Sequence, residues 1–281
     1  MAGSLYVVST PIGNLDDMTV RAVGTLKAVG LIAAEDTRRT DRLLKHFGIA
    51  TRATSLHEHN EHQKIPQLLE KLAEGTDIAL VSDAGTPLVA DPGQRLVARA
   101  AAEGIRIVPI PGASAVLAAL AVAGYPADAF VFAGFAPSKS NDRRTWLSEL
   151  ANERRTVVFF EAPHRIARTL ADMAEILADR PITVARELTK LHEQVVRSPA
   201  RNLPKLTIPP RGEFALVLGP VSDIDDNIQT VDDKELASYF YQLTNFAQTP
   251  RRAAAETAAK FGLSTNDVYA RLARLKAATP S

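Results

Sequence analysis

Short apolar runs alternate with longer amphipathic stretches along the first part of the chain. The runs are bounded by glycine, proline and polar residues, as is typical of strands buried in a parallel sheet. They cover residues 5–9, 31–34, 78–81 and 105–110. Helical spacing of apolar residues follows each run, with a first helix starting near Asp17 or Thr19 and later ones over residues 65–72, 94–103 and 116–123. This alternation predicts a parallel sheet with helices on both faces.

The alternation resumes after Gly124-Tyr125-Pro126, which marks a domain boundary. Strands are expected over residues 130–134, 156–160, 182–185 and 214–218, with a helix over residues 166–177. The acidic, irregular stretch 221–233 is typical of a linker. The fold class is therefore α/β, with an N-terminal α/β domain (1–124), a second α/β domain (125–220), a linker (221–233) and a small helical domain (234–281).

The helical domain has the pattern of a helix-turn-helix. Helices are expected over residues 234–243, 251–261 and 266–275, with a tight turn over residues 262–265. The third helix carries Tyr269, Arg271, Arg274 and Lys276. Binding to nucleic acid and a role as a small dimerisation module both remain open from this pattern.

One loop with little side-chain bulk joins the strand at 78–81 to the helix at 94–103. It belongs to the stretch ALVSDAGTPLVADPG, residues 79–93. Ala84, Gly85 and Thr86 allow another molecule to approach the backbone, since Gly85 has no side chain and tolerates positive φ. The carboxyl end of a parallel strand is where open α/β folds bind ligands. A tight turn with a helix cap is the alternative.

Other loops after the predicted strands carry candidate chemistry. Residues 35–39, Glu-Asp-Thr-Arg-Arg, place concentrated charge after a buried strand, which is typical of an active-site edge. A charged helix start capped by Asp36 or Thr37 is the alternative. Ser114 is expected to cap the alanine-rich helix that follows it. None of the loops reads G-x-G-x-x-G or G-x-x-x-x-G-K-S/T, which argues against a Rossmann dinucleotide site and a P-loop.

The composition of the chain excludes several classes of protein and of functional site. The chain has 281 residues, 46% of them hydrophobic, a net charge of +1 and no cysteine. These values predict a compact protein and exclude disulfides, thiolate zinc sites and cysteine nucleophiles. No apolar run approaches the length of a membrane span, and the N-terminus lacks the charge and apolar length of a signal peptide. A cytoplasmic protein is expected. Its net charge of +1 gives no overall positive electrostatic field that would by itself indicate nucleic-acid binding.

A metal site is suggested by the histidines and glutamates of residues 55–62, Ser-Leu-His-Glu-His-Asn-Glu-His. A helical zinc-protease motif has two histidines four residues apart, yet position 61 is glutamate where histidine is required. We therefore expect no metal and interpret the stretch as a polar loop or a helix start that faces a substrate.

Six of these loop segments together resemble a known family. They are Ser9-Thr-Pro-Ile-Gly-Asn-Leu15, Ala34-Glu-Asp-Thr-Arg38, Val81-Ser-Asp-Ala-Gly-Thr-Pro-Leu88, Pro109-Ile-Pro-Gly-Ala-Ser114, Phe159-Phe-Glu-Ala-Pro-His-Arg165 and Arg186-Glu-Leu-Thr-Lys190. They span nearly all of residues 1–220 in order. The chain resembles the tetrapyrrole (corrin/porphyrin) methyltransferase superfamily and, within it, the bacterial small-subunit ribosomal RNA ribose methyltransferase I family.

The resemblance implies two α/β domains of the tetrapyrrole-methylase type, with S-adenosylmethionine bound in a cleft between them, and a homodimer. It implies a cofactor site built from Pro11, Ile12, Ala84, Gly85, Thr86, Val89, Ser114, Ala115, Glu161, Ala162 and Leu188. Tetrapyrrole enzymes have Gly-Asp-Pro where this chain has Gly85-Thr86-Pro87, so Asp83 is expected to supply the acidic contact.

The activity that the resemblance implies is 2′-O-methylation of a cytidine ribose in small-subunit (16S) ribosomal RNA, on the RNA or on the 30S subunit. Methylation of a tetrapyrrole and a non-enzymatic RNA-binding role are the alternatives. The catalytic candidates are Glu35 or Asp36 as the base, with Arg38 or Lys139 orienting phosphates. Alternatively, these carboxylates only bind arginines structurally.

Overall fold

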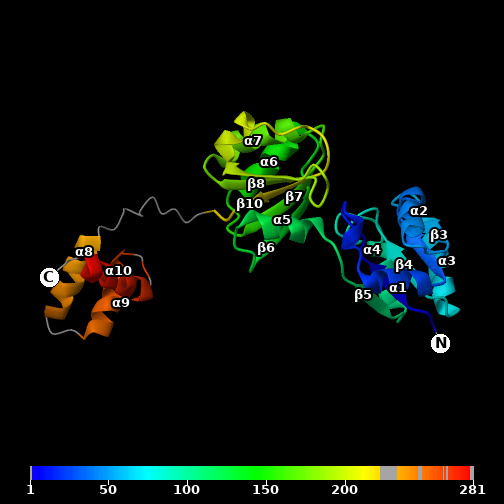
Figure 1. The fold of residues 1–281 in the computed structure, drawn as a ribbon, viewed down its shortest axis with the longest axis horizontal. Coiled ribbons are helices and arrows are strands. Elements are labelled where there is room, and N and C mark those ends of the chain that lie inside the picture. Colours follow the sequence, from blue (N-terminus) through cyan, green and yellow to red (C-terminus); the bar gives the residue numbers. More distant parts are fainter. Residues whose placement is uncertain (1, 222–232, 246–248, 262, 264, 279–281) are drawn as a thin grey trace. The chain divides into compact units, whose positions relative to one another are not determined.

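The computed structural model describes residues 2–221, 233–245, 249–261, 263 and 265–278 (Figure 1). The chain divides into two compact units, Met1–Val221 and Ser222–Ser281. The first unit contains two five-stranded sheets, and the second is helical where it is described. No helix in the described parts of the chain combines the length and the hydropathy that a bilayer crossing requires.

The first sheet is parallel throughout, as the sequence predicts. It has the order β3-β2-β4-β1-β5. The strands are β1 (Leu5–Val8), β2 (Leu31–Ala34), β3 (Ala53–Ser55), β4 (Ile78–Val81) and β5 (Ile107–Ile110). Sequence reasoning missed β3, which is a half-buried strand of three residues with two hydroxyl side chains. Because parallel strands end at one edge, the loops after β1, β2, β4 and β5 converge there.

Helices cover both faces of this sheet, which confirms the predicted layering. Helices α1 (Val20–Ala28) and α2 (Thr37–His46) bury Leu26 and Leu44 against one face, in a cluster with Ile32 of β2. Helices α3 (Glu61–Ala73) and α4 (Gln94–Ala102) cover the other. The predicted start of α1 is also confirmed, since the Thr19 side chain accepts a hydrogen bond from the Ala22 N–H at 3.1 Å.

The second sheet is mixed. It has the order β6-β7-β10-β8-β9, and only β6 and β7 are parallel. The strands are β6 (Phe130–Phe135), β7 (Thr156–Glu161), β8 (Pro181–Arg186), β9 (Gln194–Pro199) and β10 (Phe214–Leu218). Because β10 runs against both neighbours, Phe214 at its start pairs with Glu161 and Arg186 at their ends. The start of β10 therefore joins the same sheet edge as the carboxyl ends of β7 and β8.

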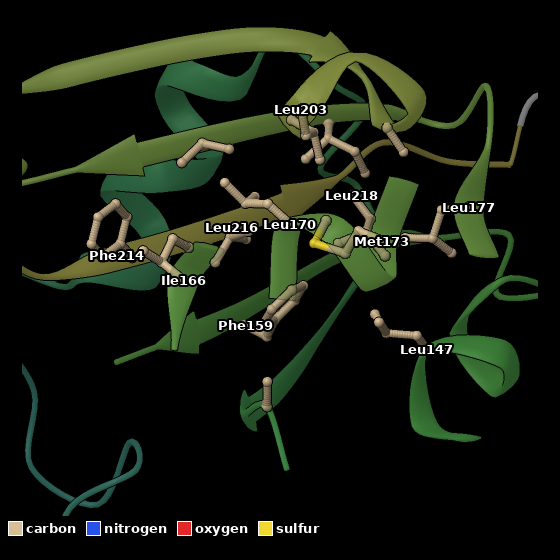
Figure 2. Packing of buried hydrophobic residues seen from close by; sticks show 14 of the residues in the cluster. Leu147, Phe159, Ile166, Leu170, Met173, Leu177, Leu203, Phe214, Leu216 and Leu218 are labelled. Carbon is tan, nitrogen blue, oxygen red and sulfur yellow. The ribbon is translucent and has the colours of Figure 1, made fainter. Parts of the chain in front are cut away.

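Different helices cover the two faces of the second sheet. On one face lie α6 (Ser140–Leu150), α7 (Ile166–Leu177) and the 3-10 helix Ala200–Lys205. Figure 2 shows Phe159 of β7, Met173 of α7 and Leu216 of β10 within this core. On the other face lies α5 (Ala115–Ala123), which follows β5 of the first sheet. Ile12 and Leu188 belong to the same cluster as α5, so residues from both halves of the unit share a core beside the site.

The second unit has a core of its own. It consists of α8 (Asp233–Asn245), α9 (Pro250–Phe261) and α10 (Thr265–Ala278). Their buried residues form one cluster: Leu236, Phe240, Ala253, Ala254, Ala258, Val268 and Leu272. The predicted linker 221–233 and the predicted turn 262–265 fall in large part on residues outside the described ones.

Candidate active site

A cavity of about 410 Å³ lies where loops from the two sheets of the first unit meet. The loops after β1, β2, β4 and β5 supply one side, and the start of α5 supplies part of the wall. The ends of β7 and β8 and the start of β10 supply the other side. The volume falls within the range of about 300–1,000 Å³ that is usual for small-molecule sites.

Nearly all the cofactor residues expected from the sequence line this cavity. They are Ile12, Asp83, Ala84, Gly85, Thr86, Val89, Ser114, Ala115, Glu161, Ala162 and Leu188. Pro11 is the exception among them, since it lines a smaller cavity of about 210 Å³ together with Arg39 and Arg42. Of the expected catalytic residues, Glu35 lines the 410 Å³ cavity, whereas Asp36, Arg38 and Lys139 do not.

Hydrogen bonds lock three of the loops together. Thr10 and Gly85 exchange two backbone hydrogen bonds, of 2.9 and 3.0 Å. The Ser9 and Thr86 hydroxyls lie 2.9 Å apart, and Thr86 Oγ1 also donates to the Ala113 carbonyl at 3.1 Å. The loops after β1, β4 and β5 thus form one rigid frame, which can hold a ligand without reorganising.

Strained backbone gathers at the same place. Four of the five described non-glycine residues with positive φ lie in two short loop segments: Leu88 (75°), Ala90 (66°), Glu187 (51°) and Thr189 (68°). The first pair brackets Val89, and the second pair brackets Leu188. Such conformations cost on the order of 1–3 kcal/mol each and are typical of ligand clamps. Both bracketed side chains line the cavity.

Apolar and aromatic groups make up much of the lining. Phe160 contacts Phe132 and Phe135 edge to face, with ring centroids 5.1 and 5.5 Å apart. Phe135, Phe160 and Phe214 all line the cavity. The sequence reasoning did not select these three rings. Phe214 could have been found only from the direction of β10, because an antiparallel β10 is needed to bring its first residue to this edge of the sheet.

Glu161 is buried and already paired. Its carboxylate forms an ion pair with Arg165 at 2.7 Å and accepts hydrogen bonds from the Ala162 N–H and the Thr169 hydroxyl. The side chain is fully buried from solvent. These bonds fix the turn that carries Ala162, so Glu161 shapes the cavity wall with its carboxylate oxygens engaged inside the fold.

Carboxylates concentrate on the side of the first sheet. Glu35 Oε2 accepts a hydrogen bond from the Asp83 N–H at 3.4 Å, and Asp83 forms an ion pair with Arg39 at 3.2 Å. Asp83 Oδ1 accepts from the Asp36 N–H at 3.0 Å. Burial first, and then the Asp83 charge, raise the pKa of Glu35. A raised pKa makes Glu35 a stronger base when it is ionised.

Asp36 and Arg38 adopt the structural alternative that the sequence left open. Asp36 caps α2, accepting from the Arg38 N–H at 2.9 Å. Its two carboxylate oxygens also accept from the Arg38 guanidinium at 3.1 and 2.8 Å. These hydrogen bonds lower the pKa of Asp36 to about 2. Asp36 is consequently a weak proton acceptor, and Glu35 is the member of the pair that faces the cavity.

Asp91 is a carboxyl group of the same cavity that the sequence reasoning passed over. The pKa of Asp91 is raised to about 6, chiefly by burial. A hydrogen bond from Ser82 lowers this pKa, and the charges of Glu35 and Asp83 raise it further. Its signal in the sequence was an acidic residue in the loop after a buried strand, within residues 79–93.

Replacing Asp91 by Asn is expected to raise the melting temperature relative to the parent as the pH rises from about 4 to about 7. The pKa of Asp91 is raised in the fold, from 3.8 to about 6. Its contribution to stability is therefore present below pH 3.8 and is lost as the pH passes through about 6. Thermal unfolding across this pH range measures the difference. An equal gain for the exposed control Asp128→Asn, or a gain independent of pH, would contradict the burial of this charge.

The histidine-rich segment 55–62 lies beside the site. His57, Glu58, His59 and Glu61 line a further cavity of about 540 Å³. Within the described residues, no group of three or more His, Cys, Asp or Glu side chains is placed to hold a metal ion. The segment forms the loop between β3 and α3 and the first residues of α3, which agrees with a loop and a helix start.

Comparison with known proteins extends the likeness over almost the whole chain. The family model for Tetrapyrrole (Corrin/Porphyrin) Methylases matches residues 4–204. The chain is 47% identical over 260 residues to Ribosomal RNA small subunit methyltransferase I of Synechocystis sp., which covers 91% of this chain and 93% of that protein. It is 45% identical over 278 residues to the Haemophilus influenzae protein of the same name, covering 96% of each.

Solved structures agree on the fold. Diphthine synthase superposes with a TM-score of 0.62 at 17% identity, covering 77% of this chain and 90% of that one. The methyltransferase CobJ superposes with a TM-score of 0.59 at 22% identity, covering 79% and 95%. At such identities the likeness establishes the arrangement of the two sheets and leaves the acceptor undecided.

Proposed function

The chain belongs to the tetrapyrrole methylases and, within them, to the ribosomal RNA small subunit methyltransferase I family, and we propose that it transfers a methyl group from S-adenosylmethionine to small-subunit ribosomal RNA. The observation that carries this proposal is identity of 45–47% to enzymes of that name along almost their full length. A tetrapyrrole acceptor is not favoured, because solved structures of a uroporphyrin-III-C-methyltransferase and a cobalt precorrin-4 methyltransferase match at only 19% and 18% identity, against 45–47% for the ribosomal RNA enzymes.

The residues present fit such a cofactor. A Cβ on Gly85 would lie 3.3 Å from Ile12 Cγ2, a tight contact that a larger residue could make only if Ile12 shifted. Ile12, Val89 and Leu188 supply apolar contacts, while Ser114 and Asp83 supply polar groups for the cofactor's ribose, amino and carboxylate groups. When bound, the cofactor supplies an electrophilic methyl group on a sulfonium.

We propose the 2′-hydroxyl of a cytidine ribose as the acceptor. A ribose hydroxyl is far less acidic than any protein carboxyl, so most of the acceleration comes from holding the oxygen in line with the methyl carbon. Glu35 accepts the hydroxyl proton as the oxygen–carbon bond forms and the sulfur–carbon bond breaks. The 2′-hydroxyl is also the group that distinguishes RNA from DNA.

Arg38 and Arg39 lie in the first turn of α2, which begins at Thr37, and are largely exposed, with side-chain exposures of 87% and 65%. In this position their guanidinium groups suit the phosphates of an RNA strand that enters the site. Their ion pairs with Asp36 and Asp83 hold them at the helix start.

The helical unit is proposed to engage RNA. Removing the residues after Val221 is expected to weaken binding to the small subunit and to flatten its salt dependence, since phosphate contacts would be lost. The first unit keeps its own hydrophobic clusters in such a variant. Filter binding at several salt concentrations measures the effect. Binding as tight as that of the full chain at every salt concentration would favour dimerisation or folding support instead.

The homodimer, the cytoplasmic location and the domain division at residues 124 and 220 are also proposals. The two sheets lie on either side of residue 124, but α5, which ends just before this residue, packs on the second sheet. Sedimentation velocity of the purified chain tests the dimer, with a single species of twice the chain mass as the expected result.

The experiment for the proposed function combines two measurements. Calorimetric titration with S-adenosylhomocysteine is expected to give one site per chain. Incubation with labelled S-adenosylmethionine and small subunits from a strain lacking this enzyme is expected to place label in the ribosomal RNA. Cofactor binding without label in RNA would show that the acceptor is wrong.

A further inference from the structure

The 540 Å³ cavity beside the cofactor cavity has no assigned ligand. The two cavities share Glu35, Ala90 and Asp91 in their linings, so they adjoin at the proposed base. The outer wall of the 540 Å³ cavity consists of the loop before α3 and the loop that leads into α4. A ligand in it would therefore reach the border where methyl transfer is proposed to occur.

Hydrogen bonds that do not involve the histidine rings hold both walls in place. Asn60 closes the loop before α3: its side chain accepts from the His57 N–H at 2.9 Å and donates to Ser55 Oγ at 3.1 Å. Glu61, which is buried, accepts from the Gly93 N–H at 2.8 Å and so ties this wall to the opposite loop. These bonds explain the loop geometry and leave the rings of His57 and His59 to another role.

The Nδ1 atom of the His57 ring is shielded from solvent and has no hydrogen-bond partner within the described part of the chain. Its ring centroid lies 6.0 Å from that of His59, at an interplanar angle of 69°. Two imidazoles that line a cavity in this way offer flat faces on which an unstacked base can lie.

The charge of the cavity argues against a phosphate within it. Glu35, Glu58 and Asp91 line it, and Arg95, the cationic member of the lining, lies 3.9 Å from Glu61. Carboxylates and imidazoles suit the edge of a base that carries an exocyclic amino group, as cytosine and adenine do. A base with a carbonyl group at that position would meet the carboxylates unfavourably.

We propose that this cavity receives the acceptor nucleoside, an unstacked amino-bearing base held against His57 with its ribose at the shared border near Glu35. This inference rests on the proposed function, whose acceptor is a ribose hydroxyl. The cavity selects the nucleoside to be methylated, and the surrounding RNA phosphates remain outside it.

The first arm of the test needs no ribosomal substrate. The full chain, saturated with S-adenosylhomocysteine, is titrated with cytidine and with uridine, and binding is followed by saturation-transfer NMR. Cytidine is expected to bind and uridine to bind more weakly. His57→Ala is expected to weaken cytidine binding roughly 5- to 150-fold, the size of one lost stacking contact, whereas His57→Phe retains a ring and most of the binding.

The second arm measures methyl transfer to small subunits. His57→Ala is expected to raise KM for the subunit by a similar factor, with the calorimetric affinity for S-adenosylhomocysteine unchanged. His62→Ala is the matched control, because His62 is an exposed histidine at the start of α3 that does not line the cavity.

The two arms separate the two proposals. Equal cytidine binding by the parent and His57→Ala, or equal binding of cytidine and uridine, overturns the nucleoside site. A loss of cofactor affinity in His57→Ala assigns the cavity to the cofactor and overturns it as well. A parent chain that binds cytidine but does not methylate the subunit leaves the nucleoside site supported and contradicts the proposed function.

Discussion

Glu35→Gln is expected to lower the single-turnover rate of methyl transfer by roughly 10²- to 10⁴-fold. Glutamine keeps the size and the hydrogen-bonding capacity of the side chain but cannot accept the hydroxyl proton. The hydrogen bond that Glu35 Oε2 accepts from the Asp83 N–H can persist, with the amide oxygen of glutamine as the acceptor. The melting temperature and the cofactor affinity are therefore expected to stay near those of the parent.

The pH profile gives a second measure of the same effect. The pKa of Glu35 is raised by burial, and only its ionised form accepts a proton. The rate of the parent is therefore expected to fall as the pH falls through this raised value. The residual rate of Glu35→Gln lacks that dependence.

Asp36→Asn is the matched control for Glu35→Gln. Asn is as good a helix cap as Asp, so α2 keeps its start. The expected change in rate is small, because Asp36 is bound to Arg38 and does not line the cavity. A larger loss of methyl-transfer rate in Asp36→Asn than in Glu35→Gln would show that Glu35 is not the base. A parental rate in Glu35→Gln would show the same. A parental rate in Glu35→Gln would leave Asp91 or water to take the proton.

Gly85→Val is expected to abolish measurable cofactor binding. Gly85 has φ of +81°, which valine adopts only with strain, and a Cβ there would press on Ile12. Gly85 also pairs with Thr10, so a shift in its backbone would disturb the frame of loops around the cavity. Calorimetric titration with S-adenosylhomocysteine measures the loss.

Gly104→Val provides the control for backbone strain alone. Gly104 has φ of +71°, and a Cβ there would meet no atom within 4 Å. This variant is expected to lose some stability and to keep its cofactor affinity. Unchanged affinity in a folded Gly85→Val, shown by circular dichroism, would remove the cofactor from this loop.

The sequence was sufficient for four of the five strands of the first sheet and for most of the loops that line the cavity. Buried parallel strands are continuous apolar runs, and residues 78–81 of β4 are all buried. Their loops also carry the family's motifs, so residue type and position were enough to select Gly85 and Ser114, which both line the cavity. Ser114 caps α5, as predicted, accepting from the Leu117 N–H at 3.4 Å.

The second sheet was harder to predict, because strand direction leaves little trace in a short apolar run. Nothing in Phe214–Leu218 distinguishes an antiparallel strand from a parallel one, so the contribution of Phe214 to the cavity was missed. Strand β9 was missed because Gln194–Pro199 is a half-polar edge strand. The roles of Glu35 and Asp36 depended on side-chain direction, which the order of charged residues does not determine.

The most direct test of the proposed function is mass spectrometry of nucleosides from small-subunit ribosomal RNA. The RNA is taken from the source organism, from a strain lacking this enzyme, and from that strain carrying either the parent chain or Glu35→Gln. One 2′-O-methylcytidine is expected to disappear in the deletion strain, to return with the parent chain and to stay absent or strongly reduced with Glu35→Gln. An unchanged content of 2′-O-methylcytidine in the deletion strain would contradict ribose methylation of small-subunit RNA by this protein.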